Sequence, residues 1–306
     1  MRDIVPRRRA YTASSSPRKR DGLAVPGAIP ERPGEVQAAL AALGIVPSKV
    51  LGQSFLVDPF VADAEAALAD DPAGRPVVEI GGGLGILTAA LVRRGIADLT
   101  VIERDRRLAH HLRSAFGSRI TVREADALDL EVPADAVVVG NLPFSSATPI
   151  LLRLFARRVP RVVALVQKEV AARLAAGPGS RTYGRLSIAA RLYGEVELFQ
   201  EVPESSFYPP PAVRGQIFVH TTRDGALPVP SVERFEAVVR TLFSSRRKQL
   251  GNLLPQVAGG HAEAEALARE ADWPPDWARR RPEELPPEAF FRLASVMSGA
   301  AKGPAR

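Results

Sequence analysis

The sequence predicts an α/β protein in which a doubly wound, mostly parallel sheet precedes a small helical domain. Short strands rich in Val and Ile alternate with helix-length segments, which is typical of parallel sheets. A glycine-rich turn at 81–85 joins one of these strands to a helix. After a linker at 225–230 only helical periodicity remains. We therefore expect three parts, which are a disordered basic tail (1–34), an α/β domain (35–224) and a C-terminal helical domain (225–306).

The composition is that of a globular protein, with 46% hydrophobic and 25% charged residues among 306. The absence of cysteine excludes disulfides, thiolate metal sites and a cysteine nucleophile. The four histidines show no ligand spacing, so no metal is expected. The sequence contains no apolar run of about 18 residues and no apolar segment typical of a secretory signal. We expect a cytoplasmic protein that does not enter a membrane.

The chain is strongly basic, with a net charge of +7, and nearly all of its 41 basic residues are arginine. A GC-rich genome that favours Arg codons would explain this. A polyanionic partner would explain it equally, because clustered arginines neutralise phosphates. The tail carries two such clusters, Arg7–Arg9 and Arg18–Arg20. It could be an RNA-binding arm, a solubilising leader or a transit peptide.

Periodicity and end signals predict the individual elements. Asp58 is expected to cap a helix that starts at Pro59, and the proline-rich segment 203–213 suits neither a helix nor an inner strand. Order is expected to resume at 187–193, and 300–306 should fray. The expected strands are 76–80, 99–102, 120–122, 137–140, 162–167, 195–201 and 215–220, and the expected helices are 35–43, 59–68, 86–92, 108–116, 150–155, 168–174, 232–242, 263–270 and 287–297.

A β-branched run that ends abruptly at Gly140 and Asn141 organises the chain. The Leu142-Pro143 step forbids helix at 142, so a buried strand should end in a rigid polar tip. The tip offers the Asn141 amide, two backbone carbonyls and the ring of Phe144. Carbonyl oxygens can accept both hydrogens of an exocyclic amine while a ring stacks on the base. An ordinary strand-to-loop turn is the alternative.

The turn Gly81-x-Gly83-x-Gly85 follows an acidic strand residue, Glu79. Glycines at a strand-to-helix turn let the backbone approach a nucleotide closely. The dinucleotide fingerprint requires a sixth-place glycine, and Ile86 stands there. The spacing instead looks like the first motif of S-adenosylmethionine methyltransferases.

Two further acids follow the next two strands. Glu103 stands where doubly wound folds place a carboxylate on ribose hydroxyls, although it could be a surface charge paired with Arg104 or Arg106. Asp126 could accept from an adenine amine, and Glu124 could do the same. Parallel sheets bind ligands at the carboxyl ends of their strands, so these residues should meet the glycine turn and Asn141 in one crevice.

Taken together, the motifs of this chain resemble the KsgA-type ribosomal RNA adenine dimethyltransferases, relatives of the Erm resistance methyltransferases. The resemblance covers about 49–254. It implies a Rossmann-like S-adenosylmethionine-dependent methyltransferase sheet with a small α-helical domain. The motifs are Gly52-Gln-Ser-Phe-Leu56, Glu79-Ile-Gly-Gly-Gly-Leu-Gly85, Asn141-Leu-Pro-Phe144, Gln167-Lys-Glu-Val170, Tyr183-Gly-Arg-Leu-Ser187, Phe207-Tyr-Pro-Pro-Pro211 and Phe243-Ser-Ser-Arg-Arg-Lys248.

The resemblance assigns roles to residues of this chain. The target adenine would lie on a catalytic tip of Asn141, Leu142, Pro143 and Phe144, without a strong general base. RNA contacts would come from the tail, Phe207, Arg181, Arg185, Arg246, Arg247 and Lys248. Two alternatives remain for these segments. The loop 177–184 could be a plain connection, and the basic residues 246–248 could only stabilise the dipole of the helix before them. S-adenosylmethionine would contact Gln53, Ser54, Leu56, Gly81, Gly83, Glu103, Asp126 and Asn141.

Several positions depart from the family pattern. Gly82 stands where proline is usual, and we expect it to be a looser, harmless replacement. Ser54 replaces a frequent Asn or His, Val213-Arg-Gly replaces Val-Asp-Ser, and Gln249-Leu-Gly replaces Thr-Leu-Arg. The last two departures lie on the side of the protein that would face RNA. The resemblance therefore implies the choice of RNA substrate less firmly than it implies methyl transfer.

The resemblance implies N6-dimethylation of adjacent adenines near the 3′ end of small-subunit ribosomal RNA, on an immature subunit, by a cytoplasmic monomer. Its target base must be single-stranded, in a loop or flipped. Three alternatives remain open. They are an Erm-type enzyme acting on 23S ribosomal RNA, a non-catalytic ribosome assembly or transcription factor, and an oxidoreductase, against which Ile86 argues.

Overall fold

The computed structural model describes residues 29–48, 53–69, 74–129, 131–223 and 232–299. The chain divides into two compact units, Met1–Ala171 with Val196–Thr222, and Ala172–Glu195 with Arg223–Arg306. The second unit resumes close to the predicted linker. It also takes in 172–195, which the sequence assigns to the first domain. Most of the predicted basic tail lies outside the described residues, as do Gly52 and the fraying end at 300–306.

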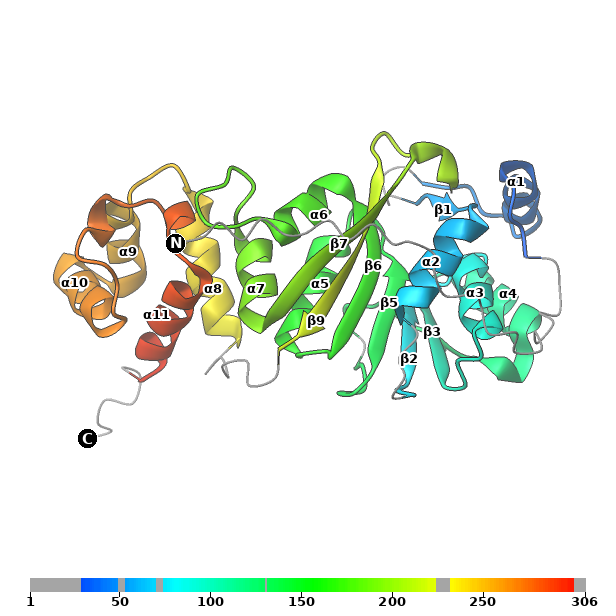
Figure 1. Cartoon of the computed structure of the whole chain (residues 1–306), viewed down its shortest axis with the longest axis horizontal. Helices are drawn as coiled ribbons and strands as arrows, with labels where there is room; N and C mark the ends of the chain where they lie inside the picture. The colour runs from blue at the N-terminus through cyan, green and yellow to red at the C-terminus, as the bar shows by residue number, and fades with distance from the viewer. Residues whose placement is uncertain (1–28, 49–52, 70–73, 130, 224–231, 300–306) are drawn as a thin grey trace. The chain divides into compact units, whose positions relative to one another are not determined.

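A seven-stranded sheet forms the first unit, and its first five strands are parallel (Figure 1). β9 then pairs antiparallel with β6 and is followed by β7. The predicted doubly wound, mostly parallel sheet is confirmed, and every predicted strand is present. The spatial order is β4 (Thr121–Glu124), β3 (Leu99–Glu103), β2 (Val77–Ile80), β5 (Val137–Asn141), β6 (Arg161–Gln167), β9 (Gly215–Thr222) and β7 (Gly194–Val202).

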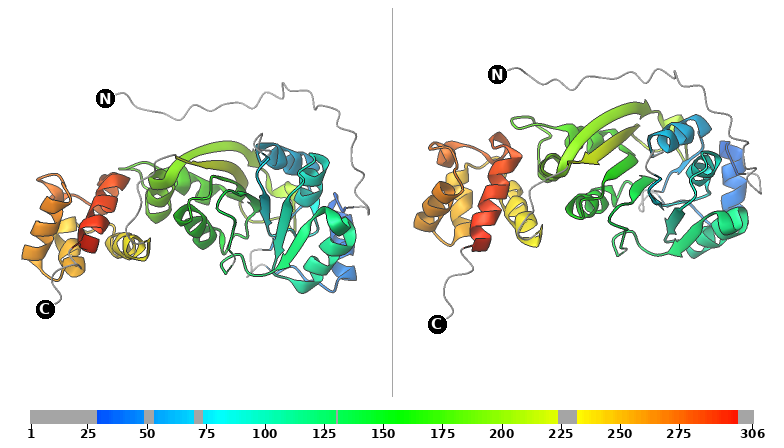
Figure 2. Two further views of the ribbon diagram at one scale, coloured as in Figure 1. Left: turned by 90° about the horizontal axis from the view of Figure 1, so that it is seen from below. Right: turned by 60° about the horizontal axis from the view of Figure 1, so that its bottom comes forward.

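Helices cover both faces of this sheet (Figure 2). Alternate strand residues and three helices, α2 (Pro59–Ala69), α3 (Ile86–Arg93) and α4 (Arg106–Phe116), share one apolar cluster. α5 (Ala147–Ala156) packs on the other face, where Phe155 lies 4.3 Å from His220 between ring centroids. Burial of this apolar surface on two sides stabilises the short strands, since each buried aliphatic side chain contributes about 2 kcal/mol.

The entry to α2 confirms the predicted cap. The Asp58 carboxylate accepts from the backbone N–H groups of Phe60 and Val61, at 3.0 and 3.4 Å. Its other oxygen accepts from the Ser206 hydroxyl at 2.9 Å. The cap therefore fixes the start of α2 and also ties it to the proline-rich segment.

The proline-rich segment forms a 3-10 turn, Glu204–Ser206, and a two-residue strand, β8 (Phe207–Tyr208), outside the main sheet. β8 pairs antiparallel with β1 (Phe55–Leu56). The sequence did not predict this pairing, because the two dipeptides lie some 150 residues apart and neither is long enough to show a period. The pairing holds 55–56 beside the carboxyl ends of the sheet strands.

The helix α1 (Pro33–Ala42) forms a separate small cluster with Leu84 and Leu108. Both leucines also line the cavity described below. A 3-10 turn, Gly117–Arg119, follows α4, and α6 (Lys168–Ala175) follows β6 and runs into the second unit.

The second unit is helical. Its helix α7 covers 187–193, where the sequence analysis expected order without naming a helix. The analysis missed α9 altogether, because Gly251 and Pro255 are unfavourable in helix interiors. α9 forms nevertheless, since Leu250, Leu253 and Leu254 bury one of its faces. The elements are α7 (Arg185–Tyr193), α8 (Val232–Ser244), α9 (Leu250–Ala258), α10 (His261–Glu270), α11 (Pro287–Gly299) and the 3-10 turns Trp277–Arg279 and Pro282–Glu284. None of the helices in the described ranges is long and apolar enough to cross a bilayer.

One glycine permits the close approach of β5 to β2. A Cβ atom on Gly140 would lie 2.4 Å from the backbone oxygen of Ile80 and 3.3 Å from its carbonyl carbon. Backbone atoms in the middle of a sheet cannot move aside as a flexible side chain can. The strands could not accept a side chain at position 140 without separating.

We predict that Gly140→Ala lowers the free energy of unfolding by about 3 kcal/mol or abolishes folding, because the new methyl group overlaps the Ile80 carbonyl. Urea denaturation followed by circular dichroism measures the change. Gly34→Ala is the control, since a Cβ there meets nothing within 4 Å in the first turn of α1. Equal midpoints for the two variants would contradict the steric explanation.

Candidate functional site

A cavity of about 440 Å³ lies at the carboxyl ends of the parallel strands. Its volume is within the usual range for small-molecule sites. The lining residues come from the segments that follow β2, β3, β4 and β5, so the predicted convergence on one crevice is confirmed. The cavity is lined by all eight residues predicted to contact a cofactor and by the whole predicted catalytic tip, namely Gln53, Ser54, Leu56, Gly81, Gly83, Glu103, Asp126, Asn141, Leu142, Pro143 and Phe144.

The glycine turn forms the floor between β2 and α3. Gly81, Gly83 and Gly85 have φ angles of +79°, +55° and +91°. Residues that carry a side chain rarely adopt such positive φ angles. The surroundings of Gly82 are not loose, whereas its harmlessness as a replacement for proline stays a prediction. A Cβ there would lie 2.4 Å from Val101 Cγ1 and 2.8 Å from Leu112 Cδ1, so neighbouring side chains already fill the space and the turn is tightly packed.

The Glu103 carboxylate braces this turn. One oxygen accepts from the Gly83 N–H at 3.0 Å, and the other accepts from the Asp105 N–H at 2.9 Å. The side chain is only 8% exposed, so the alternative of a surface charge is wrong. Burial raises the pKa of Glu103, and these backbone hydrogen bonds oppose the shift. Each carboxylate oxygen keeps a lone pair that a ligand hydroxyl could use.

Asp126, rather than Glu124, lines the cavity. Its Oδ1 accepts from the Leu128 N–H at 2.9 Å, and its Oδ2 lies 3.5 Å from Arg104 Nη1. Glu124 lies 4.0 Å from Arg113 and is not among the lining residues. Sequence reasoning left Glu124 and Asp126 as alternatives, and of these two acids only Asp126 lines the cavity.

The strand tip is held rigidly while its amide stays available. The Leu142 N–H donates to the Leu165 carbonyl at 3.1 Å, and the Pro143 carbonyl accepts from Ser146 and Ala147 at the start of α5. Asn141 lines the cavity, and its side chain makes no hydrogen bond to any residue that the structure describes. An amide in this setting can accept from or donate to a bound ligand.

Phe207 differs from the expectation. It is 1% exposed and belongs to the core cluster that α2 and α3 share, and it is not among the cavity-lining residues. Its ring packs edge-on to Phe144, with centroids 6.5 Å apart. The β1–β8 pairing buries it in this place. Phe207 therefore supports the ring of Phe144 and is not placed to stack on RNA.

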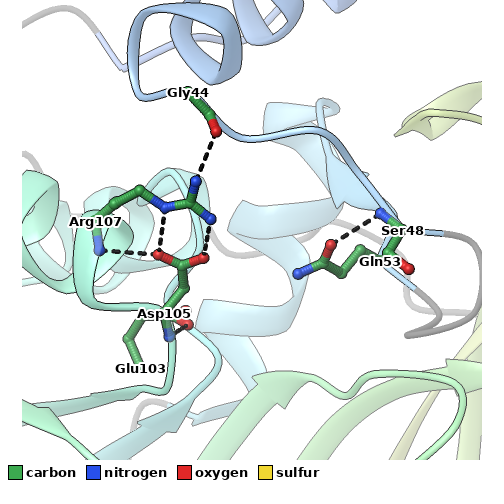
Figure 3. A network of polar contacts seen from close by, with 6 residues as sticks. All are labelled: Gly44, Ser48, Gln53, Glu103, Asp105 and Arg107. Atoms are coloured by element: carbon green, nitrogen blue, oxygen red, sulfur yellow. Dashed lines mark hydrogen bonds and ion pairs between the residues drawn. The ribbon is translucent and has the colours of Figure 1, made fainter.

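Two polar links hold the N-terminal segment at the cavity (Figure 3). The Gln53 side-chain oxygen accepts from the Ser48 N–H at 2.9 Å. The Arg107 guanidinium donates to both oxygens of Asp105 and, at 2.6 Å, to the Gly44 carbonyl. Arg107 also holds the pKa of Asp105 below its usual range. The Arg107 hydrogen bond joins the segment after α1 to the residues that follow β3, and the Gln53 hydrogen bond lies within that segment.

The other predicted RNA-contacting residues lie in the second unit. Arg181, Arg247 and Lys248 are exposed, and Arg185 is half-buried. Arg246 is engaged within the protein, because its guanidinium donates to the Glu283 carboxylate and, at 2.7 Å, to the Arg181 carbonyl. It links the loop at 177–184 to the turn after α8. Contacts of these residues with RNA remain predictions.

Two buried acids interact at the cavity, where Glu79 is a lining residue and Glu65, which sequence reasoning missed, is not. Glu65 is 0% exposed, and its carboxyl group lies beside backbone groups of Leu165 and Gly140, which oppose the rise in its pKa. Glu79 accepts from the Thr88 hydroxyl at 2.7 Å. Burial, together with repulsion from Glu79, raises the pKa of Glu65 to about 8. Burial likewise raises the pKa of Glu79 to about 8, against the hydrogen bond from Thr88.

A sequence signal for Glu65 existed. It lies at helical spacing from Val61 and Ala69, on the buried face of α2, where an acid is unusual. No group of three His, Asp or Glu residues within the described ranges is arranged to hold a metal ion.

Comparison with solved structures supports the same class of fold. A dimethyladenosine transferase from Plasmodium falciparum is 24% identical and gives a TM-score of 0.64 over 78% of this chain and 95% of that chain. The 23S rRNA methyltransferase ErmE is 25% identical and gives a TM-score of 0.55 over 79% and 98%. The fold is that of the methyltransferases.

The family follows from the sequence comparisons. The profile of the ribosomal RNA adenine dimethylase family matches residues 48–271. A probable ribosomal RNA small subunit methyltransferase A from Natronomonas pharaonis is 38% identical over 85% of this chain and 96% of that protein. The chain belongs to the ribosomal RNA adenine dimethylase family and is a methyltransferase. The recognition made from its motifs is confirmed.

We predict that Glu65→Gln raises the melting temperature, by several degrees at pH 8 and by little at pH 5. The pKa of Glu65 in the folded protein lies above the ordinary value of 4.5. Between pH 4.5 and about 8 the unfolded chain therefore binds fewer protons at this position than the folded protein does. The wild type therefore loses stability as the pH rises through this window, and a neutral amide removes that loss.

Thermal melts of wild type and Glu65→Gln from pH 5 to 9 measure the difference in melting temperature. Glu131→Gln, at an exposed position, is the matched control and should leave the slope unchanged. Parallel pH slopes for wild type and Glu65→Gln would show that Glu65 does not stay neutral in the folded protein.

Proposed function

We propose that this protein transfers methyl groups from S-adenosylmethionine to the N6 atoms of adjacent adenines near the 3′ end of small-subunit ribosomal RNA, two to each base. The observation that carries the proposal is Asn141, which lines the same cavity as the glycine turn and whose side chain makes no hydrogen bond within the described residues. A donor and an acceptor base could therefore meet there.

The charges around the cavity favour a cationic ligand. Its described lining residues include four acids, Glu79, Glu103, Asp105 and Asp126, and one cation, Arg104. The raised pKa values of Glu79 and Glu103 reduce this negative charge without reversing it. The sulfonium and ammonium groups of S-adenosylmethionine suit such a lining. The pyrophosphate of a dinucleotide does not, which together with Ile86 argues against an oxidoreductase.

The parts of the donor can be matched to residues of this chain. Glu103 would accept from the ribose hydroxyls and Asp126 from the adenine amine, while the backbone of the glycine turn borders the methionine portion. When bound, S-adenosylmethionine supplies an activated methyl group on a sulfonium that leaves readily. The protein therefore has to position the acceptor and exclude water.

The acceptor is the harder partner, because the lone pair of adenine N6 is delocalised into the ring. The Asn141 side-chain oxygen and the Leu142 carbonyl would accept its two hydrogens and favour a pyramidal nitrogen aimed at the methyl carbon. Phe144 would stack on the base, braced by Phe207. After each transfer the nitrogen gives one proton to solvent. The small side chains of Ser145 and Ser146 leave room for a methyl group already present.

The choice of ribosomal subunit rests on the relatives. A protein named as a small subunit methyltransferase is 38% identical over nearly its whole length, whereas the 23S enzyme ErmE is 25% identical. We extend the proposal to an immature small subunit as the substrate and to a monomer acting in the cytoplasm, where ribosomal subunits are assembled. Primer-extension stops on 16S-type and 23S-type RNA distinguish this reading from an Erm-type activity.

We predict that Asn141→Ala folds and binds S-adenosylmethionine but loses at least about 99% of methyl transfer, because removal of a positioned acceptor at a reacting atom costs roughly 10²-fold or more. Calorimetry measures cofactor binding, and mapping of tritiated methyl on immature small subunits measures transfer.

The matched control is Asn252→Ala, an exposed asparagine on α9, which should behave as wild type. Near-wild-type transfer by Asn141→Ala would remove the proposed mechanism. Wild-type protein that binds the cofactor but labels no RNA would favour a non-catalytic assembly role.

A further inference from the structure

One acid on the buried face of α2 is not required by the packing around it. Glu65 is fully buried. The other buried residues of that face are aliphatic, and they belong to the apolar cluster that α2 shares with the sheet, namely Val61, Ala62, Ala66 and Ala69. A leucine at position 65 would extend this cluster, whereas a buried carboxyl group costs free energy. Packing alone does not account for an acid there.

The carboxyl group of Glu65 lies where the catalytic tip leaves the sheet. α2 packs on β5 and β6, and the carboxyl lies beside backbone groups of Gly140 and Leu165. Asn141 and Leu165 are register partners, and the Leu165 carbonyl accepts from the Leu142 N–H at 3.1 Å. Glu65 thus borders the two strand segments that fix the backbone of the tip, although it does not line the cavity itself.

β5 is closely confined at this point. A Cβ atom on Gly140 would lie 2.4 Å from the backbone oxygen of Ile80, so β5 has no room to shift toward β2. We therefore expect a change of charge or volume at Glu65 to move the chain at Asn141, where β5 ends.

The charges around Glu65 favour its neutral form. β5 carries no titratable residue. The charged residues of the other elements around it are Glu79 on β2, Arg93 on α3 and Arg161 on β6. Arg93 pairs with Asp63 at 2.8 Å on the outer side of α2, and Arg161 donates to a backbone carbonyl near the end of that helix. Burial, and then repulsion from Glu79, raise the pKa of Glu65 to about 8.

We propose that Glu65, in its neutral form, is a positioning residue for methyl transfer, because it holds the backbone at 140 and 165 so that Asn141 and Leu142 face the acceptor nitrogen. The inference rests on the proposed function, since it concerns the same reaction. It gives Glu65 no contact with the donor, the base or the transferred methyl group. Loss of the carboxyl group should therefore slow the transfer step and leave donor binding unchanged.

Single-turnover methylation of immature small subunits at pH 7, with the donor bound beforehand, tests the proposal. Glu65→Gln keeps a neutral polar group of the same shape and should transfer within about twofold of wild type. Glu65→Leu has a similar volume without polar atoms and should be about tenfold slower, since misplacement by about 1 Å can cost roughly 10²-fold. Its Kd for S-adenosylmethionine, measured by calorimetry, should stay within about twofold of wild type.

Stability measurements separate positioning from a structural role. Glu65→Leu should be at least as stable as wild type in urea denaturation, because it removes a buried ionisable group. Slower transfer by such a variant cannot result from unfolding. Transfer by Glu65→Leu at the wild-type rate would overturn the inference, as would equal losses of transfer and donor affinity. Wild type that transfers no methyl group would instead contradict the proposed function.

The pH dependence gives a second, independent test. The transfer rate of wild type relative to Glu65→Gln should be constant at low pH and fall as the pH rises through about 8, where Glu65 ionises in the folded protein. This ratio cancels the effects of pH on the RNA and on the donor. Asp63→Asn, which changes an exposed acid of the same helix, is the matched control and should keep the wild-type profile. A constant ratio from pH 6.5 to 9 would overturn the role of the neutral carboxyl group.

Discussion

The close approach of β2 and β5 is the constraint on which the site depends. Gly140 lets β5 pass the Ile80 carbonyl, and one residue further on the backbone oxygen of Asn141 lies only 3.8 Å from where a Cβ on Gly81 would be. The glycine turn and the amide tip therefore border the same cavity. A donor held by the turn and a base held by the tip would be in reach of each other. Small displacements at this contact would separate them, and misplacement by about 1 Å can cost roughly 10²-fold in rate.

The acids of the first unit divide into two groups by burial. Glu65 and Glu79 are fully buried, and burial raises their pKa values to about 8 and favours the neutral form. Asp105 and Asp126 are partly exposed, and each has an arginine beside it. The negative charge that a cationic ligand meets is thus carried mainly by the partly exposed acids. Buried neutral acids cost stability, and nothing in the proposed reaction uses Glu65 directly.

Local patterns were sufficient to predict the strands and their convergence on one cavity, because strand period, glycine spacing and acids after strands all reflect one sheet edge. The cavity residues Gln53, Ser54 and Leu56 were predicted only through the family resemblance. Local patterns failed where contacts between segments distant in the sequence determine the structure. The β1–β8 pairing, the burial of Phe207 and the engagement of Arg246 by Glu283 each join positions far apart in the sequence. Gly82 belongs with these, since the side chains of Val101 and Leu112 determine that its turn is tight. α9 was missed because packing of its leucines outweighs the poor propensity of Gly251 and Pro255.

The cavity and most of the residues predicted to contact RNA lie in different units of this chain. Every residue that lines the cavity belongs to the first unit, whereas Arg181, Arg185 and the 246–248 cluster belong to the second. The engagement of Arg246 by Glu283 leaves Arg247 and Lys248 as the exposed cations of that cluster. Because a phosphate-contacting residue positions RNA without reading its bases, such residues can change without any effect on the cavity. The departures at 249–251 from the family pattern fall in the second unit, where they leave the cavity lining intact.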